Sequence, residues 1–174
     1  MKTFATIFCV ICGLLASAQN KPEPWKTIRF FEGNWEGTGT MQDTEGKYER
    51  SYRFIYNGTF LEVRNKSTYQ PTATKPESEI HEDLGYISFD KSRKKFILRQ
   101  FHIEGFVNQY VADSVSTDGK TLVFTTEAIE NIPPGWKARE TYHIISENEF
   151  TETFELAAPN QGFERYSQVK LTRK

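Results

Sequence analysis

Ten short segments with the residue pattern of β-strands follow one another between residues 34 and 172, and polar breaks separate them. The segments are rich in β-branched and aromatic residues, whereas the breaks contain turn-forming residues. Consecutive strands joined by short turns form an antiparallel meander. The predicted strands are residues 34–42, 47–56, 59–69, 79–89, 95–103, 107–115, 120–128, 136–145, 149–157 and 163–172.

A meander of this length closes most easily into a barrel, because closure removes the unpaired strand edges. The pairs Asn57-Gly58 and Asp118-Gly119 are typical of two-residue type I′ hairpin turns. We therefore predict an all-β fold, a closed antiparallel up-and-down β-barrel of about ten strands.

A short N-terminal helical turn is predicted before the first strand. Trp25, Ile28 and Phe31 are spaced i, i+3, i+6, which places them on one apolar face. Two connections, residues 70–78 and 130–135, are longer than the others. They are surface loops in the simplest interpretation and flaps at a barrel mouth in the alternative.

The first residues have the pattern of a secretory signal. Lys2 precedes a mostly apolar run over residues 4–15, and Ala-Ser-Ala follows at residues 16–18. We expect cleavage near Ala18 and export to the periplasm or the extracellular space. Cys9 and Cys12 both lie in this segment, so the remaining domain has no cysteine and needs a packed core for its stability.

Residues 19–174 are predicted to form one β-barrel domain, since this length can bury an adequate core. The chain has 22 Lys and Arg against 23 Asp and Glu. This balance argues against nucleic acid or an anionic membrane as the main partner. No later segment is apolar enough to insert into a membrane.

Two predicted strands carry a charge on an otherwise apolar face. Arg50 lies between Tyr48 and Tyr52, and Glu152 lies between Phe150 and Phe154. A charged residue in such a position is either paired inside the protein or exposed to a wet cavity. The barrel interior is therefore expected to have polar content.

No catalytic or metal-ligating motif is recognised. His81, His102 and His143 have no short ligand spacing, so no metal is predicted. The strand carboxylates Glu82, Glu140, Glu152 and Glu155 could form an acid–base pair only if two of them met in a cavity.

The segment Gly33-Asn34-Trp35 resembles the Gly-x-Trp opening of the calycins, the superfamily of lipocalins and fatty-acid-binding proteins. The resemblance implies that Trp35 closes one barrel end and packs against a basic residue near the last strand. Arg173 is the natural partner in a cation–π contact. Gly33, Trp35 and Arg173 are thus expected to be structural.

The chain also resembles nitrobindins, which are ten-stranded haem-binding barrels, and related secreted bacterial lipocalin-like domains. The pattern Gly-Asn-Trp-Glu-Gly at residues 33–37 and the segment His-Glu-Asp-Leu-Gly-Tyr at residues 81–86 are similar to theirs. Nitrobindins bind haem iron through a histidine on the last strand. The corresponding position here is about Tyr166, and no histidine follows His143. Strand alternation places Tyr166 on the face opposite to the apolar residue Val169. A bulge in the last strand would change this.

We expect a secreted binding module that holds a small hydrophobic or amphipathic ligand inside the barrel. The alternatives are a haem-dependent or cofactor-free enzyme and a structural module with a filled barrel. A small-molecule ligand is the expected partner, and a homodimer is a further option. No cofactor is expected, with haem as the alternative. The candidate lining residues are Trp35, Tyr52, Phe54, His81, Tyr86, His102, Tyr142, Phe154 and Tyr166.

Overall fold

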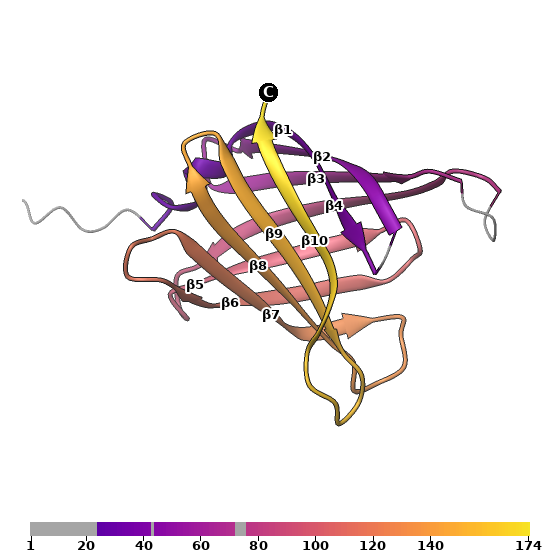
Figure 1. Ribbon diagram of the computed structural model, residues 1–174. Coiled ribbons are helices and arrows are strands. Elements are labelled where there is room, and N and C mark those ends of the chain that lie inside the picture. Colours follow the sequence, from indigo (N-terminus) through magenta and orange to yellow (C-terminus); the bar gives the residue numbers. More distant parts are fainter. Residues whose placement is uncertain (1–23, 43, 72–75) are drawn as a thin grey trace, which may run out of the picture.

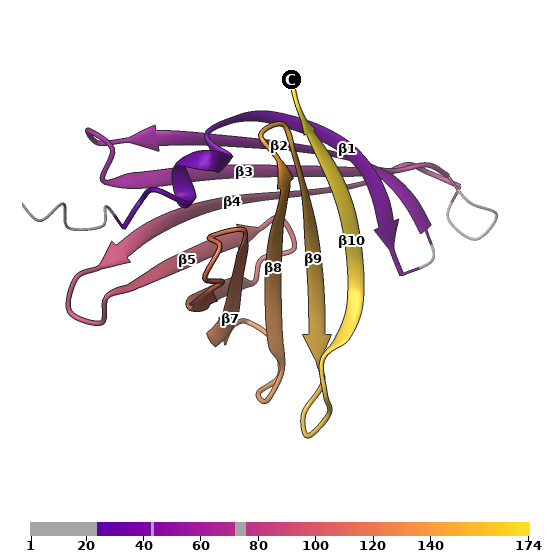
Figure 2. The same ribbon diagram turned by 60° about the vertical axis from the view of Figure 1, so that its left-hand side comes forward.

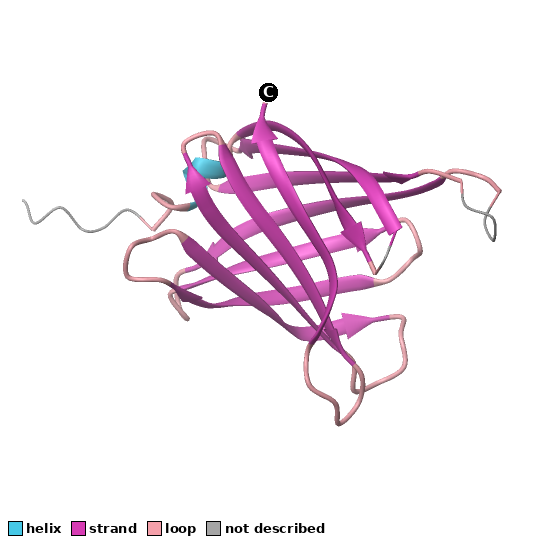
Figure 3. Cartoon of the chain, viewed as in Figure 1, coloured by secondary structure: helices cyan, strands magenta, loops and turns pink. Residues whose placement is uncertain are grey.

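The computed structural model describes residues 24–42, 44–71 and 76–174, which form a ten-stranded antiparallel barrel with one 3-10 turn (Figure 1, Figure 3). The predicted signal segment, which contains both cysteines, lies outside the described residues. The elements are η1 (Ile28–Phe31), β1 (Gly33–Met41), β2 (Thr44–Ile55), β3 (Phe60–Tyr69), β4 (Glu79–Asp90), β5 (Lys95–His102), β6 (Val107–Val115), β7 (Thr121–Glu130), β8 (Lys137–Ser146), β9 (Glu149–Ala157) and β10 (Glu164–Arg173).

The strands pair in sequence order, and β1 pairs with β10 to close the barrel. The predicted fold class is confirmed, and each predicted strand is present with its ends shifted by at most three residues. Asn57 and Gly58 have φ values of 57° and 79°, as a type I′ turn requires. The prediction was wrong for Asp118-Gly119, where only Gly119 has a positive φ, of 71°.

The closing pair of strands depends on glycine at two inward positions of β1. A Cβ atom on Gly37 would lie 1.9 Å from the carbonyl oxygen of Lys170, and one on Gly39 would lie 2.2 Å from that of Gln168. The missing side chains let β1 bend closely against β10. Figure 2 shows the resulting twist, with β2–β4 running steeply across β8–β10.

The turn η1 fills one end of the barrel, which we call the closed end. The indole of Trp35 donates a hydrogen bond to the carbonyl oxygen of Phe31 at 2.8 Å. The guanidinium of Arg173 lies 4.1 Å from the Trp35 ring centre and donates to the carbonyl oxygens of Phe30 and Glu32. The Trp35–Arg173 contact therefore joins the first strand, the last strand and η1. Within the described ranges, no helix is long and apolar enough to cross a bilayer.

Replacing Gly37 by Ala should destabilise the barrel by about 1–3 kcal/mol, because the new methyl group meets backbone atoms that cannot rotate away. Chemical denaturation measures the loss. Gly162→Ala is the matched control, since a Cβ there has nothing within 4 Å. Equal stability of the two variants would contradict the close approach of β1 and β10.

Candidate functional site

The two ends of the barrel differ in filling. The closed end is packed with aromatic and aliphatic side chains that surround Phe31 and Phe150. The opposite end contains a cavity of about 560 Å³, within the range of small-molecule sites, roughly 300–1,000 Å³. Its apolar wall consists of Met41, Phe106, Ile129, Ile132, Pro133, Trp136, Phe154 and Leu156.

Loops that connect strand pairs build the mouth of this cavity. Phe106 belongs to the β5–β6 turn, and Ile132, Pro133 and Trp136 belong to the β7–β8 connection. The longer connection at residues 130–135 thus contributes apolar side chains to the cavity. Its position at the mouth agrees with the interpretation of this connection as a flap and not as a simple surface loop.

A buried ion pair crosses the barrel interior at the inner end of the cavity. The Nε and Nη2 atoms of Arg50 donate to the two carboxylate oxygens of Glu152 at 3.1 and 2.6 Å. Its Nη1 atom donates to the carbonyl oxygens of Glu49 and Lys66. Both side chains are buried, so the bidentate geometry and the two carbonyls compensate for lost hydration.

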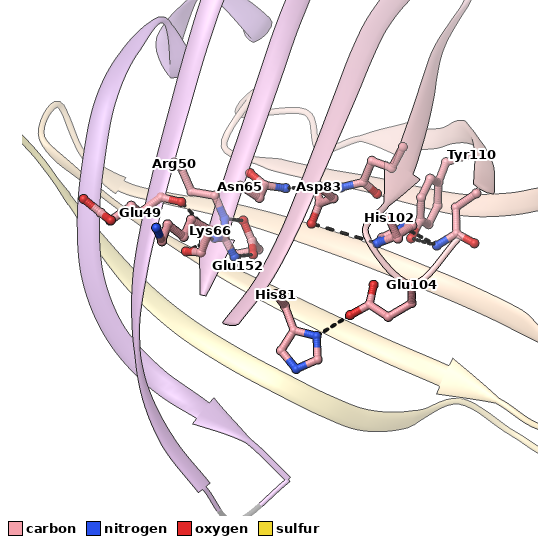
Figure 4. Close-up of polar contacts among 12 residues, drawn as sticks. Glu49, Arg50, Asn65, Lys66, His81, Asp83, His102, Glu104, Tyr110 and Glu152 are labelled. Carbon is pink, nitrogen blue, oxygen red and sulfur yellow. Dashed lines mark hydrogen bonds and ion pairs between the residues drawn. The ribbon is translucent and has the colours of Figure 1, made fainter. Parts of the chain in front are cut away.

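The ion pair belongs to a ring of polar side chains that line the barrel interior from seven strands. Figure 4 shows four of them, Arg50, Asn65, Asp83 and Glu152. We call this ring the polar belt. Strand pairing brings neighbouring members together, because Asn65 is the register partner of both Arg50 and Asp83, and Gln100 is that of Asn108. The belt consists of Arg50, Asn65, Asp83, Gln100, Asn108, Glu140 and Glu152.

Asp83 is the acceptor at the centre of one side of the belt. The side-chain amides of Asn65 and Gln100 donate to its Oδ1 atom at 2.7 and 3.2 Å. Burial raises the pKa of Asp83 to about 6, although Arg50 and the two amides act in the opposite direction. The carboxylate is therefore mostly ionised at neutral pH.

Glu140 differs from the other acids of the belt because no described residue donates a hydrogen bond to its buried Oε2 atom. Its side chain lines the cavity and is buried, and its Oε2 atom has no hydrogen-bond partner within the described residues. Burial raises the pKa of Glu140 well above the usual value, and the nearby Glu152 and Asp83 raise it further.

His102 lies between the belt and the mouth. The Nδ2 atom of Asn108 donates to its Nε2 atom at 3.2 Å, and its Nδ1 atom faces the Asp83 carboxylate at 4.0 Å. The ring stacks on Phe106 with centroids 4.0 Å apart. Burial lowers the pKa of His102 to about 4, so the ring is neutral at pH 7.

His81 lies nearer to solvent at the rim of the cavity. Its Nδ1 atom contacts Glu104 (Figure 4). Its Nε2 atom lies 2.9 Å from a carboxylate oxygen of Glu79. Its ring packs edge-on against Tyr69. Because carboxylates engage both ring nitrogens, His81 is less available than His102 as a ligand-binding donor.

A bulge in β10 brings Tyr166 into the cavity wall. The register with β9 shifts between Arg165 and Ser167, and the Tyr166 ring lies 5.8 Å from that of Phe154. Without this shift, the alternation of the strand would place Tyr166 on the outer face. The bulge resolves the conflict in the sequence pattern.

The structure places four of the nine predicted lining residues in the cavity, namely His81, His102, Phe154 and Tyr166. The other five do not line it. Trp35, Tyr52 and Tyr142 pack around Phe150 and Phe31 at the closed end.

Phe54 and Tyr86 lie elsewhere. Phe54 packs against Trp25 and beneath Arg29, and Tyr86 is on the outer face because it alternates with the buried residues Gly85 and Ile87. Period-two alternation identifies an inward residue, but it does not distinguish the closed end from the open end.

The belt residues Asn65, Asp83, Gln100 and Asn108 were not predicted as site residues. The only available signal was the charge at Arg50 and Glu152 on apolar faces, and their pairing agrees with the expected polar interior. Over the described part of the chain, no group of three or more His, Cys, Asp or Glu side chains has metal-binding geometry.

Residues 25–173 match the model of a family described as "THAP4-like, heme-binding beta-barrel domain". The crystal structure of Rv2717c from M. tuberculosis is similar, with a TM-score of 0.67 and 18% identity, over 87% of this chain and 97% of that chain. A de novo designed fluorescence-activating β-barrel aligns with a TM-score of 0.43 and 14% identity over 84% and 95% of the two chains. A comparison with curated proteins gives no significant match.

Replacing Glu152 by Leu should cost about 3–5 kcal/mol of unfolding free energy, because Arg50 is left charged and unpaired in the interior. The double variant Arg50→Met/Glu152→Leu should recover most of this loss. Urea denaturation of both single variants and the double variant gives the coupling energy. Additive losses would contradict the ion pair.

His102 should remain neutral at pH 5, with its proton on Nδ1, because Nε2 accepts from Asn108. Nitrogen-15 NMR of the imidazole rings distinguishes this tautomer from the other tautomer and from the imidazolium. The unfolded chain protonates His102 near its ordinary pKa of about 6.5. This residue therefore lowers the stability of the fold as the pH falls from about 6.5 to about 4. An imidazolium signal from His102 in the folded protein at pH 5 would contradict the assignment.

Proposed function

The chain belongs to the THAP4-like, haem-binding β-barrel domain family, and from this premise we propose that its open cavity binds one small amphipathic molecule. The observation that carries the proposal is the uneven filling of the barrel. One end is packed by η1 and its aromatic partners, and the other holds a cavity of about 560 Å³. A barrel filled along its whole length would have no such volume.

The lining of the cavity supports an amphipathic ligand. Its wall near the mouth is apolar, as Met41, Ile129, Trp136 and Leu156 illustrate, whereas the polar belt forms its inner end. Apolar walls provide most of the affinity in such sites, and a few polar groups orient the ligand.

Haem is the first ligand to test, because the family is described by it. The residues present fit the group. The apolar wall suits a flat macrocycle, and His102 and Tyr166 line the cavity with a nitrogen and an oxygen that can bind iron. His102 is the better donor of the two, because its ring is neutral and its Nδ1 atom faces a carboxylate, as in many metal-binding histidines.

Bound haem would supply an iron centre whose axial ligand and surrounding polarity decide between ligand binding, activation and electron transfer. The chain itself would exclude water with the apolar wall, and Asp83 would orient the His102 ring through Nδ1. The Nε2 atom would exchange its hydrogen bond from Asn108 for the metal. The carboxylates of the belt would repel the haem propionates, which would therefore lie at the mouth.

Export is part of the proposal. Its support is the sequence of residues 1–18, in which a basic residue, an apolar run and Ala-Ser-Ala follow one another. In the periplasm or outside the cell, a barrel without cysteine in residues 19–174 would not depend on the redox state for its fold.

Titration of the purified protein with haem should give a Soret band that saturates at one haem per chain. Ser167→Trp, which places a large side chain in the cavity wall, should abolish the band, and Ser114→Trp on the exposed part of β6 should not. If no Soret band forms with the unchanged chain, haem is excluded as the ligand.

The same titration identifies the axial donor. His102→Ala should shift the Soret maximum and weaken binding by at least about tenfold, since a metal contact is lost. Tyr166→Phe should leave the spectrum unchanged. The opposite result, a shift in Tyr166→Phe alone, would assign the iron to the tyrosine.

A further inference from the structure

We propose that Glu140 and the polar belt form a head-group site that selects a ligand with a protonated amine on an apolar chain. This inference rests on the proposed use of the cavity as a ligand site and adds the chemical class of the group at its inner end. The amine would contact Glu140, and the chain would extend along the apolar wall toward the mouth.

The unpaired carboxyl of Glu140 is the first observation. The residue is only 7% exposed, it lines the cavity, and its Oε2 atom has no partner among the described residues. A buried polar group without a hydrogen bond is costly, so a donor from a ligand that reaches it is strongly favoured.

The balance of charge around the cavity is the second observation. Among the described residues that line it, Arg50 is the only lysine or arginine, and Glu152 already binds it with both oxygens. Neither Asp83 nor Glu140 forms an ion pair with a lysine or arginine of that lining, and Arg50 acts on both only from a distance. A positive group on a ligand is therefore complementary to the belt, whereas a carboxylate would be repelled.

The orientation of the belt amides is the third observation. Asn65 and Gln100 both direct their N–H groups to Asp83, which fixes the way each amide faces. Their oxygens, like that of Asn108, are buried without a hydrogen-bond donor in the described part of the chain. These oxygens add further acceptors without donors, and therefore partial negative charge, to the polar belt.

The apolar wall supplies the remainder of the site. Ile129, Phe154 and Leu156 lie in the wall above the belt, and Ile132 and Trp136 extend it to the β7–β8 connection. A linear or ring-shaped apolar group of moderate size can bury its surface there, which contributes free energy in proportion to the area buried.

Binding of an ammonium group should release a proton from Glu140. Burial raises the pKa of Glu140, and a cation beside it favours the ionised form. An alkylammonium group, with a pKa near that of lysine, about 10.4, stays charged throughout the neutral range. Affinity should thus rise with pH until Glu140 is ionised in the free protein. The charged and titratable groups that face Glu140 are Arg50, Asp83, Glu152, Tyr52, Tyr110 and Tyr142.

The test is calorimetric titration of the full chain with three ligands of equal length, namely n-octylammonium, n-octanol and n-octanoate, each below its micelle concentration. We expect n-octylammonium to bind at least about tenfold more tightly than n-octanol, because it adds a charge-assisted hydrogen bond. n-Octanoate should bind most weakly. Titrations in buffers of different ionisation enthalpy should show proton release with the amine and none with n-octanol.

Glu140→Gln keeps the shape of the neutral carboxyl and removes its charge. It should lose the preference for the amine and the proton release while it retains n-octanol binding. Glu147→Gln in the exposed β8–β9 turn is the matched control and should behave as the unchanged protein. Equal affinity for amine and alcohol, or an undiminished preference in Glu140→Gln, would overturn the inference and leave the ligand cavity intact. Failure of all three ligands to bind would also overturn the inference, and the haem titration then decides separately whether the proposed cavity function stands.

Discussion

The buried ion pair of Arg50 and Glu152 lies at the boundary between the packed end of the barrel and the end that holds the cavity. Two buried charges lose their hydration and need hydrogen-bond partners in its place. Here a bidentate contact between the two side chains and two backbone carbonyls that accept from Arg50 provide these partners. The pair connects β2 to β9 across the interior. Aromatic packing against η1 continues on one side of it, and on the other the wall opens into the cavity. The ion pair thus separates a part of the barrel that provides stability from a part that is free to bind.

Most of the fold could be predicted from the sequence because its signals are local. Alternation and turn residues define strands, and a meander of ten strands has few ways to hide its edges other than closure. The family resemblance drawn from residues 33–37 is confirmed by the match over residues 25–173. By alternation Gly37 and Gly39 share the face of Trp35, whereas their contact with the β10 backbone appears only in the closed barrel. Asp118-Gly119 was mispredicted because Asp118 does not adopt the positive φ of a type I′ turn.

The site was less predictable, because position along the barrel axis is a tertiary property. Tyr52 and Tyr142 have the same inward alternation as Phe154, but only Phe154 reaches the cavity. The charge at Glu152 on an apolar face was informative, although its partner on β2 could be found only once the barrel was closed. For Tyr166, strand alternation indicates the wrong face. A single-residue bulge changes which face it occupies, and nothing in the sequence of β10 specifies that bulge.

The polar belt makes the inner end of the cavity differ from its mouth in electrostatic potential. Asp83 is mostly ionised at neutral pH, and the only lysine or arginine among the described lining residues, Arg50, is already paired with Glu152, so the potential at the inner end is negative. A ligand with an anionic end should bind with that end at the mouth. Haem would bind in this way, with its propionates at the mouth. A ligand with a cationic end is favoured in the opposite sense, with its charge beside Glu140. Both orientations follow from the same distribution of charge, so the sign of a ligand's head group should determine which end of it enters the barrel first.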